Sequence, residues 1–390
     1  MKNIAPRFRL KLSNGLVALA VAASALVLAS TGCASEQLVL RDSAKSAAGR
    51  GGGTYSISIL GDVHYDAPPL ERFHSSGRAV HFKNNVVMWE EDMPALLAAS
   101  GRLVGSDTSF ALQLGDLIDG AGDFNSHTQM LAEATAILEK AYPRLPVISV
   151  CGNHDIIGGW RRGYNSFMLP WLRRQVAHLT TNAVTSTTFG FRHGPDLWVV
   201  INFNDAEATI PILEKLLADN PDVRYTFVAI HAPVLPMDQF RFRWFYLGEE
   251  KQNEARRKVR ALLARRNAIV LAAHVHTLEY KEWEGDGGRI TEMVLNSVMR
   301  WGDAGEHIRP EIPKVRSETP EDYGAWLKKA RLSDDEAKFN AMFEEYWPGL
   351  KTRYAASAGG HHILRVSDDG VTLEYYWRDK LEPTKVFTLR

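Results

Sequence analysis

Short apolar or alternating stretches recur along the chain and predict β-strands. Apolar and polar positions alternate in Tyr55–Leu60 and Phe110–Leu114, whereas Val147–Val150, Tyr225–Ile230 and Ala268–Ala272 are short and largely apolar. Alternation is typical of a strand with one buried face, and a short apolar run is typical of a strand buried on both faces. Further strands are expected at Trp198–Phe203, Ile290–Leu295, Ile363–Val366 and Val371–Tyr376.

Helical patterns lie between these strands, since apolar residues there recur at intervals of three and four. The expected helices are Val86–Ala99, Thr128–Tyr142, Ala206–Asp219 and Glu249–Arg266. Strands that alternate with helices indicate a layered α/β fold. Residues 301–354 carry helix-start signals at Thr319 and Ser333 and predict a small helical insert. This insert either caps the crevice of the sheet or packs against the sheet edge.

Carboxylate, imidazole and carboxamide side chains follow five of the predicted strands. They are Asp62 and His64, then Asp116, then Asn153, His154 and Asp155, then His231, and finally His274 and His276. In an open α/β sheet the carboxyl ends of the strands form a crevice, so residues far apart in sequence converge there. Carboxylate, carboxamide and imidazole groups without a thiolate suit divalent ions such as Mn, Fe, Zn or Ni. The pattern therefore predicts a metal centre.

At these residues the chain resembles the calcineurin-like metallophosphoesterase family. That family's pattern is D-x-H, G-D-x-x-D, G-N-H-D, a lone His and G-H-x-H, and it is matched here by Asp62–His64, Gly115–Asp119, Gly152–Asp155, His231 and Ala273–His276. Ala273 replaces the family's Gly, which removes no ligand. The resemblance spans residues 55–297 and implies a four-layer αββα sandwich. It also implies a hydrolase that cleaves phosphomonoesters or phosphodiesters.

The resemblance further implies two divalent metal ions held by seven side chains. They are Asp62, His64 and His276 for one ion, Asn153, His231 and His274 for the other, and Asp116 as the bridge between them. Two such ions can hold a bridging hydroxide as the nucleophile and stabilise charge that develops on phosphorus. His154 is implied to be the general acid for the leaving oxygen, with Asp155 orienting its ring. Asp119 is expected to cap a helix or to support the ligands from behind.

Two other functions are weighed against this hydrolase. A metal-binding scaffold of the same fold would keep the crevice without catalysis, but it has no need of an acid such as His154. A nuclease would need a basic surface. The formal charge is zero, and without the four bases of residues 1–32, which hold no acids, 42 bases face 46 acids. A net charge of about −4 gives no indication of dedicated nucleic-acid binding and favours a small phosphoester substrate.

Two arginines, Arg161 and Arg162, follow the Asn153 segment by a few residues. They are candidate ligands for a substrate phosphate, because guanidinium groups bind phosphate oxygens in pairs. The alternative is that they are ordinary solvated surface charges.

The beginning of the chain predicts export. Residues 1–33 combine a basic start with the apolar run Leu16–Leu28, which is too short to span a bilayer, and end in a segment that resembles a lipobox at Cys33. Lipid on Cys33 would anchor the protein in the cell envelope, and ordinary signal-peptidase cleavage is the alternative. Residues 34–54 read as a flexible tether before the domain 55–390. Cys151 is then the remaining cysteine, expected as a small buried side chain.

Overall fold

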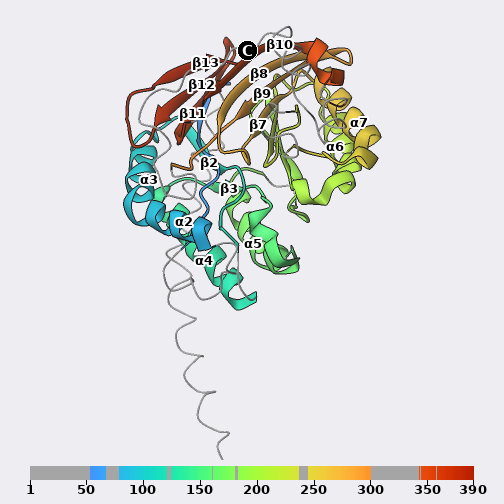
Figure 1. Cartoon of the computed structure of the whole chain (residues 1–390). Coiled ribbons are helices and arrows are strands. Elements are labelled where there is room, and N and C mark those ends of the chain that lie inside the picture. Colours follow the sequence, from blue (N-terminus) through green and yellow to red (C-terminus); the bar gives the residue numbers. More distant parts are fainter. Residues whose placement is uncertain are drawn as a thin grey trace, which may run out of the picture. The chain divides into compact units, whose positions relative to one another are not determined.

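Two β-sheets face each other, and helices cover their outer faces (Figure 1). The structure is a computed structural model that describes residues 53–66, 79–120, 124–159, 161–180, 183–236, 245–299, 342, 344–356 and 358–390. The predicted export signal, Cys33 and nearly all of the tether lie outside these residues. In the described part of the chain, no helix combines the length and apolar character needed to cross a membrane.

The first sheet has six strands in the order β13-β12-β11-β1-β2-β3. Their bounds are β1 Tyr55–Leu60, β2 Thr108–Gln113, β3 Val147–Ser149, β11 Gly360–Ser367, β12 Gly370–Trp377 and β13 Lys385–Thr388. Strands β1, β2 and β3 are parallel, whereas β11 pairs antiparallel with β1 and continues as an antiparallel ribbon. The carboxyl ends of β1, β2 and β3 therefore meet at one edge.

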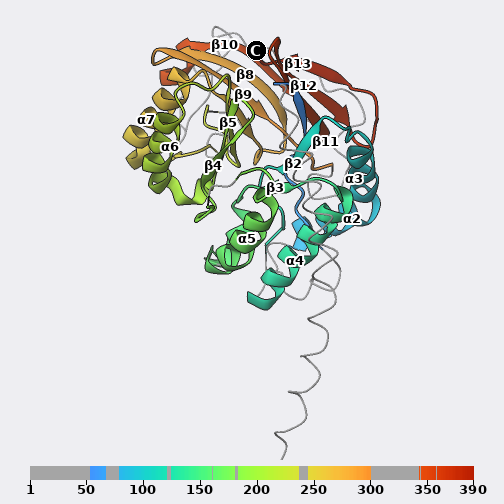
Figure 2. The same cartoon turned by 180° about the vertical axis from the view of Figure 1, so that it is seen from behind.

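The second sheet has seven strands in the order β10-β8-β9-β7-β6-β5-β4. Their bounds are β4 Phe189–His193, β5 Asp196–Ile201, β6 Thr226–Ile230, β7 Ile269–Ala272, β8 Leu278–Gly285, β9 Gly288–Val294 and β10 Leu350–Ala356. The four strands β5, β6, β7 and β9 are parallel, and β4, β8 and β10 join antiparallel at the two sides. The edge strand β4 and its neighbour β5 are seen best from behind (Figure 2).

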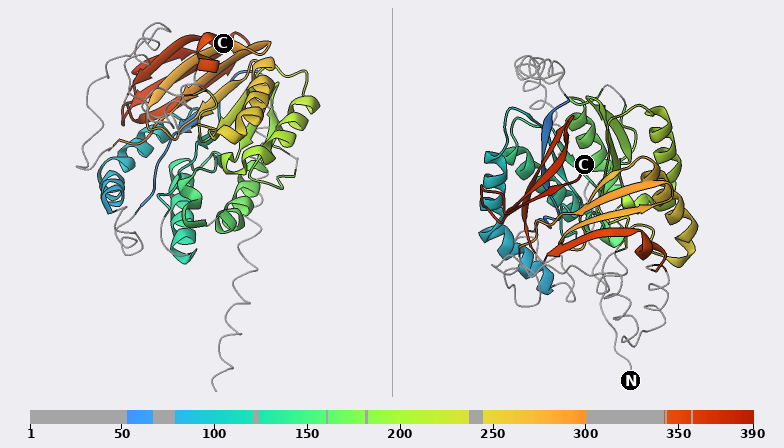
Figure 3. Two further views of the ribbon diagram at one scale, coloured as in Figure 1. Left: turned by 45° about the vertical axis from the view of Figure 1, so that its right-hand side comes forward. Right: turned by 90° about the horizontal axis from the view of Figure 1, so that it is seen from above.

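Helices flank both sheets. They are α2 Ala79–Glu91, α3 Met93–Arg102, α4 Phe124–Ala141 and α5 Arg161–Val176 beside the first sheet, and α6 Thr209–Asp219 and α7 Asn253–Arg265 beside the second. Short 3-10 turns are η3 His154–Gly159, η4 Phe203–Ala208, η5 Glu250–Gln252 and η6 Trp347–Gly349. Seen from above, the paired sheets lie between α2 and α3 on one side and α6 and α7 on the other (Figure 3). The predicted αββα sandwich is confirmed.

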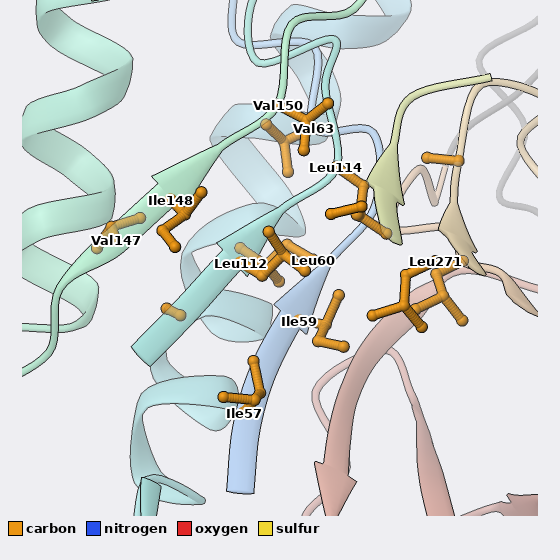
Figure 4. Packing of buried hydrophobic residues seen from close by; sticks show 14 of the residues in the cluster. Ile57, Ile59, Leu60, Val63, Leu112, Leu114, Val147, Ile148, Val150 and Leu271 are labelled. Atoms are coloured by element: carbon orange, nitrogen blue, oxygen red, sulfur yellow. The ribbon is translucent and has the colours of Figure 1, made fainter. Parts of the chain in front are cut away.

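The space between the sheets is filled by apolar and aromatic side chains from both. Phe110 of β2 packs edge-on against Trp198 of β5, with ring centroids 5.0 Å apart. Tyr55 of β1 donates a hydrogen bond of 2.9 Å to the buried Asp196 of β5. Ile57, Ile59 and Leu112 of the first sheet belong to the same buried cluster as Leu271 of β7 (Figure 4). Such close packing fixes the two sheets against each other.

Two expected elements differ from the structure. The predicted helix Val86–Ala99 is two helices, because the chain turns at Asp92 and Pro94 begins a new first turn, where its missing N–H costs nothing. The predicted helical insert 301–354 is wrong at its end, where residues 350–354 belong to β10 and pair antiparallel with β8. Residues 301–341 of that insert lie outside the described residues.

Candidate metal centre

The seven predicted ligands lie just beyond the carboxyl ends of strands in both sheets. Asp62 and His64 follow β1, Asp116 follows β2, and Asn153 follows β3; His231 follows β6, and His274 and His276 follow β7. An isolated parallel bridge between Asp62 and Asn296 joins the two sheets at this edge. The structure therefore brings together residues that span more than two hundred positions of sequence.

The first group of potential donors consists of Asp62, His64, Asp116 and His276, whose ligand atoms all lie within 4.8 Å of one another. The Nε2 atoms of His64 and His276 are 2.9 Å apart. Nε2 of His276 is 3.8 Å from Oδ1 of Asp62, and Nε2 of His64 is 3.7 Å from Oδ2 of Asp116. Imidazole nitrogens and carboxylate oxygens thus converge on one point.

The second group consists of Asp116, His231 and His274, again within 4.8 Å. Nε2 of His231 lies 3.2 Å from Oδ2 of Asp116, 3.0 Å from Nδ1 of His274 and 3.1 Å from Oδ1 of Asn153. Asp116 belongs to both groups, which is the position that the family resemblance implies for a bridging ligand. The two groups are therefore adjacent and share one carboxylate.

The backbone at these ligands is unusual. Four of them have a positive φ, a conformation that non-glycine residues seldom adopt: His64 at 42°, Asp116 at 50°, His274 at 72° and His276 at 52°. Strained conformations of this kind persist where the surrounding fold holds them, and they concentrate at functional sites. Two close approaches also require glycine. A Cβ on Gly115 would lie 2.5 Å from Nδ1 of His231, and one on Gly152 would lie 2.1 Å from the Asp116 nitrogen.

Hydrogen bonds from outside the centre fix the orientation of the ligands. Nδ1 of His231 donates to the carbonyl oxygen of Leu114 at 2.8 Å, which directs Nε2 of the same ring toward Asp116. The backbone N–H of His274 donates to both carboxylate oxygens of Asp62 at 3.1 Å. Partners behind the ligands are a common way to hold metal-binding side chains in place.

The electrostatics of the centre fit a cation. Asp62 and Asp116 are 0% and 1% exposed and close to each other. Burial and the charge of Asp116 raise the pKa of Asp62 to about 6. Burial lowers the pKa of His231, but the carboxylates of Asp116 and Asp62 outweigh it and raise that pKa to about 9. Buried carboxylates and imidazoles are stable together only with protons or a metal ion among them, and the donor set suits a borderline divalent ion.

His154 lies beside this centre, but its partner is Asp119 and not Asp155. Nδ1 of His154 donates to the carbonyl oxygen of Asp119 at 2.8 Å and lies 3.2 Å from its Oδ1. The expectation that Asp155 orients the ring is wrong. The Asp155 carboxylate turns back and accepts the backbone N–H groups of Gly152 at 2.7 Å and Ile118 at 3.2 Å. It therefore stabilises the loop that carries His154.

Asp119 connects the acid candidate to the ligand set. Its Oδ1 is 3.6 Å from Nδ1 of His64 as well as 3.2 Å from Nδ1 of His154. The expected supporting role of Asp119 thus agrees with its position. Burial lowers the pKa of His154, but Asp116 and Asp119 raise it to about 9. The His154 side chain is 21% exposed, so its ring reaches the surface of the crevice.

The two arginines lie at the start of α5. Arg161 and Arg162 line a cavity of about 570 Å³ together with Asn165 and Ser166. Arg161 forms an ion pair with Asp205. Their contact with a substrate phosphate stays a prediction.

One neighbour of the ligands was not foreseen as part of the site. The ring of Phe203 lies 5.4 Å from that of His231 and 6.0 Å from that of His274. Phe203 begins η4 directly after β5, at the same edge of the sheet as the ligands. The sequence could have indicated Phe203 as a site residue, because it is the last residue of a predicted strand and the ligands follow the ends of such strands.

Residues 55–278, more than half of the chain, match the family described as calcineurin-like phosphoesterase. The chain belongs to this family. No curated protein matches the sequence significantly.

Similar solved structures include several phosphatases. Purple acid phosphatase PPD1 from yellow lupin (Lupinus luteus) seeds is 13% identical with a TM-score of 0.49, and the match covers 86% of this chain and 54% of that one. A structure of PhoD is 8% identical with a TM-score of 0.47 and coverages of 87% and 69%. GAP50, the anchor in the inner membrane complex of Plasmodium, is 11% identical with a TM-score of 0.46 and coverages of 86% and 88%. The chain thus spans about half the length of the lupin enzyme.

Proposed function

We propose that this protein is a metal-dependent hydrolase of phosphoesters with a dinuclear centre. The observation that carries the proposal is the pair of adjacent donor groups that share Asp116. One ion would be held by Asp62, His64 and His276, and the other by Asn153, His231 and His274. Two divalent ions bound in this way supply an activated water and stabilise negative charge on a phosphoryl group.

The chain's own contribution to the chemistry is the transfer of a proton from His154. Because Nδ1 of His154 donates to the Asp119 carbonyl, Nε2 is the nitrogen left to serve the substrate. The neighbouring Asp119 carboxylate and Asp116 favour the protonated ring. An imidazolium at the mouth of the centre can give its proton to a leaving oxygen, which typically accelerates such a step by about 10²–10⁴-fold.

A non-catalytic metal-binding scaffold is the second candidate. It is supported by the fact that a ligand set alone does not require turnover. The pair of His154 and Asp119 favours catalysis, since the two donor groups that share Asp116 are complete without His154. Together with His64, the pair forms a third group of potential donors, so the position of His154 beside the centre is itself close enough to reach a bound ion or its substrate. The substrate class proposed is a small phosphoester. The sequence motif at Cys33 supports a lipid anchor in the cell envelope as the setting.

The test is hydrolysis by the full-length protein after chelation and reloading with Mn, Fe, Zn or Ni. A generic aryl phosphodiester is compared with the matching monoester, and the preferred ester defines the class of substrate. Asp116→Asn should abolish turnover, because it weakens both donor groups at once. Asp369→Asn, at an exposed position of the β11–β12 turn, is the matched control and should keep full activity.

Turnover by the wild type that is lost on chelation and in Asp116→Asn supports the hydrolase. Two ions bound per chain with no turnover of either ester would favour the scaffold. Equal activity in Asp116→Asn and the wild type would refute the assignment of the centre.

A further inference from the structure

A second cavity, rich in arginine, lies at the other end of the central strands from the metal centre. It has a volume of about 710 Å³, and its lining includes Thr226 at the start of β6 and Gly288 at the start of β9. The metal-centre residue His231 follows the end of β6, five residues after Thr226. A strand rises about 3.3 Å per residue, so about 17 Å of strand separates the two sites.

The lining of this cavity carries a large excess of positive charge. Five arginines face one carboxylate: Arg224, Arg265, Arg266, Arg289 and Arg390 against Glu284. They come from separate parts of the chain, namely the approach to β6, the end of α7, the start of β9 and the segment after β13. The fold has therefore gathered the charges, which do not form a run in the sequence. This clustering contrasts with the near-neutral composition of the whole chain.

Most of this charge has no carboxylate partner among the described residues. Arg224 is the exception, because it pairs with Asp196 at 2.7 Å and also with Asp368. Arg265 and Arg289 form no side-chain hydrogen bond or ion pair within the described chain. The carboxylate of Glu284 lies 3.6 Å from Nζ of Lys351. Because it already balances that charge, it balances less of the charge of the arginines.

The two remaining arginines are anchored by neutral oxygens. Arg266 donates to the backbone carbonyls of Asn220 and Pro221. Arg390 donates to the carbonyls of Leu389 at 2.8 Å and Ala268 at 3.3 Å, to that of Asn267 and to the hydroxyl of Thr291. These bonds hold each guanidinium in place without cancelling its charge. Burial, and to a smaller extent the nearby Arg289, lowers the pKa of Arg390 to about 10, although the charge of Glu282 acts in the opposite direction.

A purely structural explanation accounts for only part of this arrangement. Cations at the carboxyl end of a helix complement the helix dipole, and Arg265 and Arg266 lie at that end of α7. Arg289 and Arg390 are not on a helix, so the dipole does not explain them. Like charges held together in a cavity destabilise the protein unless an anion balances them. Guanidinium groups are well suited to phosphate oxygens, which they bind in bidentate pairs.

We propose that the cavity bordered by Arg265, Arg289 and Arg390 is a binding site for an anionic phosphate group, separate from the metal centre. Its volume falls in the range of small-molecule sites. The same chemistry is presented by a free pyrophosphate and by the headgroup of an anionic phospholipid. The proposal does not depend on the hydrolase activity.

The first experiment measures inorganic pyrophosphate binding by calorimetry, using full-length protein freed of metal by chelation and then dialysed. Without metal, the centre of Asp and His residues is not a competing site for phosphate. The test variant is Arg265→Glu with Arg289→Glu, chosen because neither side chain supports the fold through a described hydrogen bond. The control is Arg174→Glu, an exposed arginine of α5 that also forms no such bond.

The wild type and Arg174→Glu should bind one pyrophosphate per chain, and the double variant should bind at least about tenfold more weakly. Sedimentation with phosphatidylcholine vesicles, with and without phosphatidylglycerol, then distinguishes the two sources. Loss of binding to the phosphatidylglycerol vesicles in the double variant assigns the site to a lipid headgroup, and unchanged vesicle binding assigns it to a soluble phosphate. Equal pyrophosphate affinity in the double variant and the wild type would overturn the proposal, as would no measurable binding by the wild type.

Discussion

A fall in pH below 6.5 should destabilise this protein through His362, a fully buried histidine of β11. Its ring is 0% exposed and lies beside Tyr375, with ring centroids 5.5 Å apart. Burial and the neighbouring His361 lower its pKa from 6.5 to about 3. At pH 5 the ring is therefore neutral in the folded protein but protonated in the unfolded chain. The stability from the neutral ring is complete above pH 6.5 and is lost progressively as the pH falls toward 3.

The size of the effect follows from proton linkage. One extra proton bound by the unfolded chain lowers the free energy of unfolding by about 1.4 kcal/mol per pH unit. Between pH 6.5 and pH 5 the loss from His362 is about 2 kcal/mol, a substantial part of the 5–15 kcal/mol that is typical of a folded domain. His361, whose pKa burial lowers to about 4, adds a loss in the same direction.

The assay is urea unfolding of metal-free protein at pH 7 and pH 5, followed by tryptophan fluorescence. His362→Leu removes the titrating ring and keeps an apolar side chain, so the difference in stability between the two pH values should shrink by about 2 kcal/mol. His178→Leu, at a partly exposed position after α5, is the control histidine. The same pH dependence in His362→Leu and the wild type would refute the reasoning.

Three further outcomes are expected. His154→Asn should lower turnover by about 10²–10⁴-fold, most for poor leaving groups, with normal metal content by mass spectrometry; loss of both metals would mean that its role is misassigned. Lys281→Met should lower the free energy of unfolding by about 3–5 kcal/mol, because it leaves the buried Glu292, 3.0 Å away, without its cation. In chemical denaturation, the free energy of unfolding should rise again when Glu292→Gln is combined with Lys281→Met. Gly120→Ala places a Cβ 1.7 Å from the His154 carbonyl and should destabilise the protein far more than Gly194→Ala, which also has positive φ but meets nothing within 4 Å; similar melting temperatures of the two variants would contradict this.

Local sequence patterns predicted most of the central strands. The predicted strand Tyr55–Leu60 has the same bounds as β1. Its alternation predicted one buried face, but all six residues are buried, because the strand lies inside the sandwich. The pattern did not predict α5, since Gly163 and Pro170 interrupt it and its amphipathic character is weak. The break between α2 and α3 was missed as well, although Pro94 marks it. The first error arises where tertiary packing decides the outcome against local propensity, whereas in the second a local signal, Pro94, was present and was not used.

The sequence predicted those residues of the site that lie in short motifs at the ends of strands. All seven ligand candidates converge because the parallel strands place their ends at one edge. The residue that hydrogen-bonds to the ring of His154 could not be predicted from its neighbours in the sequence. Asp155 is next in sequence, but the 3-10 turn directs its carboxylate to the backbone, and Asp119 arrives from the loop after β2. The arginine cavity draws on residues from 224 to 390, a grouping that only the folded chain creates.

The division of the donors between two sheets has a consequence for how the protein is assembled. Asp62, His64, Asp116 and Asn153 belong to the first sheet, and the three remaining histidines belong to the second. Neither half of the sandwich could hold both ions alone, so affinity for metal develops only when the halves have docked. If the proposed ions are bound, each would link the two sheets, because a ligand at a hundred times its dissociation constant adds about 2.7 kcal/mol to the stability of the folded state. Metal supply would thereby govern the lifetime of the protein as well as its chemistry.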